Sequence, residues 1–144
     1  MHITEVRIKL VGNAAERLLA FCSITIDGAF VIRDIKLIGG PAGAFVAMPS
    51  RKLCAHCNGC GHKNAFKAAY CNQCGGRLSN GDPPRDGDGR PRLYADIAHP
   101  INASCRDLIQ RRIVREYEAE VVRAREPGYV SRYESIGDED RPRR

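Results

Sequence analysis

Alternation of apolar and polar positions organises the N-terminal part of the chain. Residues 3–11, ITEVRIKLV, alternate with a period of two, which predicts a strand with one buried face. Residues 18–38 predict two strands joined at Asp27-Gly28, a dipeptide that favours a tight hairpin turn. A turn rich in glycine follows, and residues 44–48 predict a short fourth strand. This pattern indicates an antiparallel meander of four strands.

Helical periodicity replaces this alternation in the C-terminal part of the chain. An apolar stripe with a spacing of four residues predicts a helix that packs on one side. The stripe consists of Ile109, Ile113, Tyr117 and Val121. Asn102 or Ser104 can cap the start of this helix, and Pro127-Gly128 stops it. The polar residues 127–144 are predicted to form a disordered tail.

Neither periodicity is present between the meander and the helix. Residues 53–79 contain five cysteines, and residues 80–92 are rich in Gly, Pro and charge, which is typical of a flexible linker. We therefore expect an α+β domain, a small antiparallel sheet with a C-terminal helix, formed by residues 1–52 and 93–126. A module at residues 53–79 interrupts it.

The cysteine spacing in this module predicts a metal site. Two CxxC pairs separated by ten residues favour zinc, which prefers a tetrahedral set of thiolates. In two near copies of the motif a glycine follows the second cysteine, and a tight turn needs a residue that tolerates positive φ. The predicted ligands of one structural Zn²⁺ are therefore Cys57, Cys60, Cys71 and Cys74.

Other ligand sets are less favoured by the same pattern. Cys54 forms a competing CxxC pair with Cys57, but Asn58 follows that pair, so Cys54 is a bystander or an occasional substitute ligand. A rubredoxin-type iron site also uses paired CxxCG motifs. We interpret His56 and His62 as exposed polar residues. Cys22 and Cys105, outside the module, are interpreted as small buried hydrophobic residues.

Residues 57–78 resemble the small zinc-ribbon family. The shared pattern is CxxCG, an Asn a few residues on, an aromatic residue before a second CxxCG, and a following Leu. Because so short a segment cannot bury enough core to fold alone, the metal is expected to fold it. Phe66 and Tyr70 could stack on bases, but we expect them to form the small core of the module.

The composition indicates a basic protein with reduced cysteine thiols. The 144 residues carry a formal charge of +6, and residues 49–94 hold eight Lys/Arg against three Asp. This permits an acidic partner such as nucleic acid without demanding one. The odd number of cysteines, seven, and the lack of a secretion signal favour reduced thiols. With no apolar run long enough for a membrane helix, we expect a cytoplasmic protein.

Four further segments carry a second resemblance. They are ITEVRIKLV, SITIDGAFVIRDIKLI, GAFVAMPSRK and DIAHPINASCRDLIQRRIVREY, and FVAMPS and DIAHPIN are the most specific. Together they resemble the SpoVG family, stage V sporulation protein G, the septation regulators. In that family a short polar loop joins these two motifs, where this chain has the zinc ribbon and its linker. The resemblance implies a dimeric regulator linked to septation, sporulation or cell-cycle control that binds DNA and RNA.

Seven basic residues are the candidate phosphate contacts for such binding. They are Arg51, Lys52, Lys63, Lys67, Arg111, Arg112 and Arg115. The competing interpretation of the three arginines is a solvated helix face paired with Glu116, Glu118 and Glu120. Asp96 and His99 form no convincing catalytic pair and are expected to hydrogen-bond the turn before the helix.

Two functions are compatible with these features. The first is a nucleic-acid-binding regulator of the SpoVG type that contacts phosphates through the helix and the inserted module. The second is an adapter in cell division or transcription whose zinc ribbon binds another protein. An enzyme is not expected, because four cysteines leave a metal no open position.

Overall fold

The computed structural model describes residues 1–12 and 16–133. Its chain forms two compact units. The first, which we term the body, comprises Met1–Pro49 together with the chain from Ala98 onward. The second, which we term the insertion, comprises Ser50–Ile97. Each unit is described separately below.

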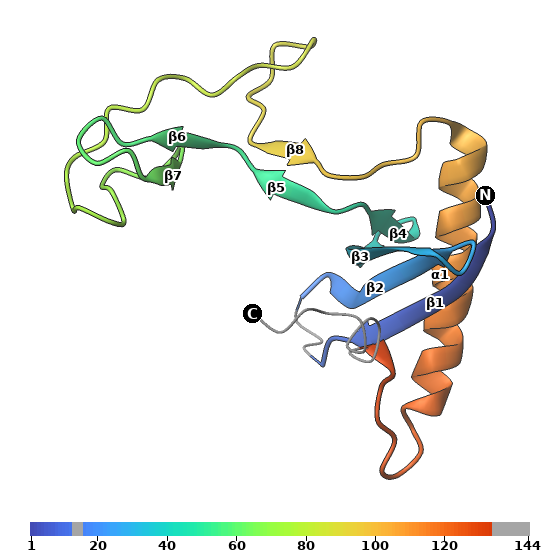
Figure 1. Cartoon of the computed structure of the whole chain (residues 1–144). Coiled ribbons are helices and arrows are strands. Elements are labelled where there is room, and N and C mark those ends of the chain that lie inside the picture. The colour runs from blue at the N-terminus through green and yellow to red at the C-terminus, as the bar shows by residue number, and fades with distance from the viewer. Residues whose placement is uncertain (13–15, 134–144) are drawn as a thin grey trace. The chain divides into compact units, whose positions relative to one another are not determined.

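The body contains the antiparallel meander that the alternating pattern predicts. The strands are β1 (Ile3–Leu10), β2 (Leu18–Ile26), β3 (Phe30–Gly40) and β4 (Gly43–Ala47), in the spatial order β1-β2-β3-β4 (Figure 1). Asp27 and Gly28 join β2 to β3 with φ of 52° and 65°. Positive φ at both residues matches the right-handed twist of the strands that the turn connects. The predicted α+β class is confirmed.

One helix, α1 (Ala103–Arg123), covers one face of this sheet (Figure 1). The Asn102 side chain accepts a hydrogen bond of 2.8 Å from the Cys105 amide and so caps the helix start. Ile109 and Ile113 of the predicted stripe are buried. They pack with the inward residues of β1, β2 and β3, which are Ile3, Val6, Ile8, Ala20, Cys22, Ile24, Ile35 and Leu37.

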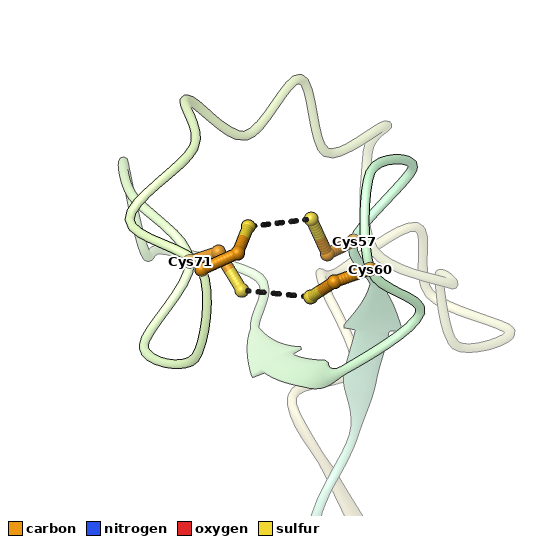
Figure 2. Close-up of side chains that lie close together, drawn as sticks. Cys57, Cys60 and Cys71 are labelled. Atoms are coloured by element: carbon orange, nitrogen blue, oxygen red, sulfur yellow. Dashed lines mark hydrogen bonds between the residues drawn. The ribbon is translucent and has the colours of Figure 1, made fainter.

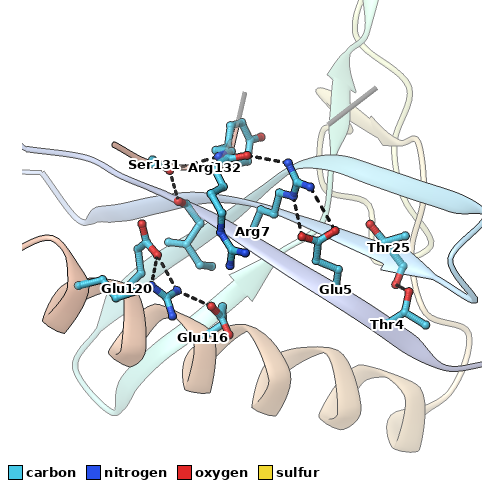
Figure 3. A network of polar contacts seen from close by, with 11 residues as sticks. Thr4, Glu5, Arg7, Thr25, Glu116, Glu120, Ser131 and Arg132 are labelled. Carbon is cyan, nitrogen blue, oxygen red and sulfur yellow. Dashed lines mark hydrogen bonds and ion pairs between the residues drawn. The ribbon is translucent and has the colours of Figure 1, made fainter. Parts of the chain in front are cut away.

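A buried acid replaces the expected apolar residue near the end of the helix. Glu120 is buried, whereas Val121 is only partly buried. Glu120 binds the Arg123 guanidinium at 2.6 Å and accepts a hydrogen bond of 2.6 Å from the Tyr129 hydroxyl. Arg123 also pairs with Glu116 (Figure 3). These partners satisfy the charge of the buried carboxylate.

The segment after the helix lies against the edge strand β1. Ser131 Oγ donates a hydrogen bond of 2.9 Å to the Ile8 carbonyl, and Arg7 donates one of 2.7 Å to the Arg132 carbonyl (Figure 3). Tyr133 is only 4% exposed. Residues 127–133 therefore pack on the body, although their polar sequence predicted disorder. The remainder of that predicted tail, residues 134–144, lies outside the described residues.

The insertion is built from two short ladders. β5 (Ser50–Lys52) pairs with β8 (Tyr94–Asp96), and β6 (Cys54–His56) pairs with β7 (Lys63–Ala65), both antiparallel. Because β5 and β8 bond to each other, this compact unit extends beyond the 53–92 expected from sequence. Within the predicted linker, the Arg92 amide donates to the Pro84 carbonyl and the Asp86 amide to the Arg90 carbonyl, which gives this segment a hydrogen-bonded turn.

In the described part of the chain, no helix combines the length and hydropathy needed to cross a membrane.

Candidate metal centre

The two CxxCG motifs fold into near-identical turns. The Gly61 amide donates a hydrogen bond of 2.8 Å to the Cys57 carbonyl, and the Gly75 amide donates one of 3.0 Å to the Cys71 carbonyl. The two glycines have φ of 77° and 74°. A side chain is strained at such angles, so these turns need the glycine that follows each second cysteine.

These turns bring four sulfur atoms together. The sulfurs of Cys57, Cys60, Cys71 and Cys74 all lie within 4.8 Å of one another. Across the site the Cys57–Cys74 sulfurs are 3.8 Å apart and the Cys60–Cys71 sulfurs 3.6 Å (Figure 2). A tetrahedral ion with metal–sulfur bonds of about 2.3 Å would separate its ligands by about 3.8 Å. The geometry is thus compatible with a four-thiolate metal site.

Backbone and amide N–H groups point at these sulfurs. Gly59 N donates to the sulfur of Cys57 at 3.3 Å, and Gly76 N donates to that of Cys74 at 3.4 Å. Cys71 receives two such bonds of 3.4 Å, from Gln73 N and the Asn64 side chain. Donors of this kind favour thiolate over thiol, which is the form that binds metal.

The pKa values of the cysteine thiols reflect both these N–H donors and the neighbouring sulfurs. The Cys74 backbone N–H, aided by the Asn64 amide, lowers the pKa of the Cys71 thiol to about 5. For Cys60 the backbone N–H of His62 acts to lower the pKa, but desolvation and the Cys71 sulfur outweigh it and raise the pKa to about 11. Neighbouring thiolates repel one another, so a site that ionises all four needs a cation.

Asn64 ties the two turns to each other. Its side chain is buried, donates to the His62 carbonyl at 3.0 Å, and accepts a hydrogen bond of 2.9 Å from the Asn72 amide. Together with its bond to the Cys71 sulfur, this links the segment that follows the first motif to the second motif. The sequence pattern included this Asn but assigned it no role, because the spacing does not show which way its amide points.

The remaining candidates in this region lie outside the sulfur cluster. Cys54 is exposed, and its sulfur is 3.6 Å from the Lys52 carbonyl. His56 and His62 are also exposed. Tyr70, expected in the core of the module, is 63% exposed, whereas Phe66 is half-buried. Tyr70 lies just before Cys71, and its backbone forms a single bridge with Arg77.

The seven candidate phosphate contacts divide between the two units. Arg51, Lys52, Lys63 and Lys67 belong to the insertion and are all exposed. Arg111, Arg112 and Arg115 lie on α1, where Arg112 is half-buried and the other two are exposed.

Two of the insertion lysines are brought together by the fold. Lys52 and Lys67 line a groove of about 250 Å³ with Phe66, Tyr94 and two leucines, Leu53 and Leu93. Arg51 and Lys63 do not line it. Sequence reasoning missed Tyr94, because only the register that sets it opposite Lys52 reveals that the two share a groove.

Comparison with known proteins covers most of the chain. The SpoVG family model matches residues 1–119. A septation protein SpoVG of Caldicellulosiruptor saccharolyticus is 34% identical over 119 residues, which cover 83% of this chain and 93% of that protein.

Two further relatives carry the same name. The protein of Lachnoclostridium phytofermentans is 37% identical over 118 residues, covering 82% of this chain and 87% of the relative. That of Agathobacter rectalis is 36% identical over 121 residues, covering 84% and 97%. With the four-stranded meander and its C-terminal helix, these matches place the chain in the SpoVG family.

Proposed function

We propose that this protein is a nucleic-acid-binding regulator of the SpoVG septation type. Its relatives are named septation proteins, which supports a role in septation or sporulation. Basic side chains of α1 and of the insertion would neutralise phosphates, with little readout of base edges.

The observation that carries this proposal is the pairing of the helix acids. Glu116 and Glu120 bind Arg123 rather than the arginines one or two turns earlier. Within the described residues, none of the seven candidate basic side chains forms an ion pair. Arg111 and Arg115 are therefore exposed cations with no ion-paired carboxylate among the described residues, and a guanidinium matches two phosphate oxygens at once.

The metal in this proposal is a structural Zn²⁺. Cys57, Cys60, Cys71 and Cys74 would hold it, and as a closed set of four they leave no position for substrate. When bound, the ion supplies folding free energy to a module that has little apolar core. The chain's own contribution is the set of N–H donors, including Asn64, that hold the sulfurs as thiolates.

Two copies of the chain are part of the proposal. A homodimer would present the basic side chains twice, so that two weak contacts act together at high effective concentration. The rival function is an adapter that binds a protein through the insertion, and it differs in its response to salt.

The test is a titration of zinc-loaded protein against random-sequence DNA and RNA at several salt concentrations. For a phosphate binder, the logarithm of the binding constant falls linearly with the logarithm of the salt concentration. On duplex DNA each neutralised phosphate adds about 0.9 to the steepness of this slope. The double variant Arg111→Gln/Arg115→Gln should lower that slope by about 2, and Lys36→Gln, an exposed lysine of β3, should leave it unchanged.

A second arm replaces residues 53–92 by a short polar loop. Weaker binding by this variant would assign contacts to the insertion, and equal binding would assign them to the body. If the intact protein binds no nucleic acid at any salt concentration, the proposal fails and the adapter function replaces it.

A further inference from the structure

We infer that the groove of the insertion is a binding site for an unpaired segment of nucleic acid, with a base stacked on Tyr94 and phosphates held by Lys52 and Lys67. This inference rests on the proposed nucleic-acid binding. It adds where on the protein the nucleic acid binds and that the bound nucleic acid is single-stranded. It concerns a surface built by the insertion alone.

The β5–β8 ladder forms one wall of the groove. Lys52 pairs directly with Tyr94 in the antiparallel register, so both side chains leave the same face of the ladder. The Leu53 amide donates a hydrogen bond of 2.9 Å to the Leu93 carbonyl and extends the ladder by one step. Lys52 and Tyr94 are thus held side by side by backbone pairing.

The end of β7 forms the other wall. Phe66 and Lys67 lie in a turn closed by a hydrogen bond of 3.0 Å from the Ala68 amide to the Ala65 carbonyl. The Asn80 side chain also lies within 3.4 Å of the Ala65 carbonyl and 3.3 Å of the Phe66 carbonyl. Both walls are therefore shaped before any ligand arrives, which lowers the entropic cost of binding.

The lining combines two cations with two aromatic rings and contains no carboxylate. Tyr94 is 54% exposed even though it lies in a strand. Asp96 lies on the same face two residues further along β8, outside the lining. An aromatic face stacks on any base, and ammonium groups attract the phosphates that flank it. This pairing of ring and charge is complementary to a nucleotide unit.

The size and composition of the groove favour a polymer segment that is single-stranded. A volume of about 250 Å³ is below the range usual for whole small-molecule ligands. In a duplex both faces of each base are stacked, so only an unpaired base can offer a face to Tyr94. The groove should therefore prefer single strands over duplexes of the same length.

The test compares labelled oligothymidine and oligouridine of about twelve nucleotides, within the range of strand lengths that single-strand sites cover, with a duplex of equal length. It uses the full zinc-loaded chain. Tyr94→Ala should weaken single-strand binding about five- to a hundredfold, and Tyr94→Phe should preserve it. Tyr70→Ala is the matched control, because this tyrosine is similarly exposed but does not line the groove.

The lysines give an independent readout. Lys52→Gln and Lys67→Gln should each lower the salt slope on single strands by about 0.7. Arg77→Gln, an exposed cation of the same module outside the groove, should not. Cobalt loading of each variant reports whether the four-sulfur site has folded, so a binding defect is separable from loss of structure.

A photo-crosslink with 4-thiouridine in the oligouridine locates the contact directly. Adducts on peptides carrying Tyr94 or Phe66 are expected. The inference is overturned if adducts form only on α1, if Tyr94→Ala binds like Tyr70→Ala, or if duplex binds as tightly as single strand. In those cases salt-dependent binding would still support the proposed function, whereas the absence of any binding would refute both.

Discussion

The Asn64 side chain donates a hydrogen bond of 3.4 Å to the sulfur of Cys71. Both residues are buried, and the same amide also accepts from the Asn72 backbone. One neutral side chain therefore supports a candidate metal ligand and fixes the spacing of the two cysteine turns.

Replacing Asn64 by Ala should weaken zinc affinity about ten- to a hundredfold, which is the usual cost of losing a partner of a metal ligand. Competition with a chromophoric chelator measures this affinity. Asn58→Ala is the control, because Asn58 lies within the first cysteine turn but its side chain is exposed. Equal affinities of the two variants would contradict the assigned role of Asn64.

The cysteines of the insertion should divide into four ligands and one bystander. Cys54→Ser should keep one zinc per chain, because its sulfur lies outside the cluster of Cys57, Cys60, Cys71 and Cys74. Cys60→Ser should lose the metal or hold it far more weakly. Elemental analysis of purified protein gives the stoichiometry and also distinguishes zinc from iron. Loss of metal from Cys54→Ser would refute this ligand set.

The fold of the body could be predicted because local signals and burial agree. Asp27-Gly28 specifies its own turn, and the alternation in β1 to β3 separates a face that α1 covers from one that it leaves open. The packing of residues 127–133 could not be predicted, because it depends on one buried ring, that of Tyr133, and on single hydrogen bonds between a polar segment and β1. Such contacts leave no periodic pattern.

The candidate metal site was predictable for a similar reason, since each pair of ligands and the glycine after it lie within one short turn. The groove was not. Lys52 and Tyr94 are far apart in sequence, and only the β5–β8 register places them opposite each other. Tyr70 shows the reverse error, because in so small a module an aromatic residue was expected in the core, and the fold leaves this one exposed.

Cys22 should make stability fall at alkaline pH. Burial raises the pKa of this thiol from 9.0 to about 12, so the folded state binds its proton more tightly than the unfolded state. Its contribution to the free energy of unfolding is complete below about pH 9. This contribution is lost as the pH rises toward 12, at up to about 1.4 kcal/mol per pH unit.

Urea unfolding of the protein and of Cys22→Ala from neutral pH to about pH 11, within the window set by the two pKa values, checks this. The variant removes the titrating group and leaves every other one in place. The stability advantage of the unmodified protein should be constant up to about pH 9 and then shrink. An advantage that stays constant over the whole range would contradict the buried, neutral state of Cys22.

Tyr133 should anchor the segment after the helix to the body. Its side chain is almost completely buried, and the Arg33 guanidinium lies 5.5 Å from the centre of its ring. Its hydroxyl reaches Asp34 only at 3.5 Å, which is a weak hydrogen bond. The ring should therefore contribute more to stability than the hydroxyl does.

Tyr133→Ala is expected to lower the free energy of unfolding by about 2–4 kcal/mol, because it removes a buried aromatic ring. Tyr133→Phe should change it by less than about 1 kcal/mol, since it keeps the ring and loses only a weak hydrogen bond. Chemical denaturation followed by circular dichroism measures both. If Tyr133→Ala is as stable as Tyr133→Phe, residues 127–133 do not pack on β1 in solution.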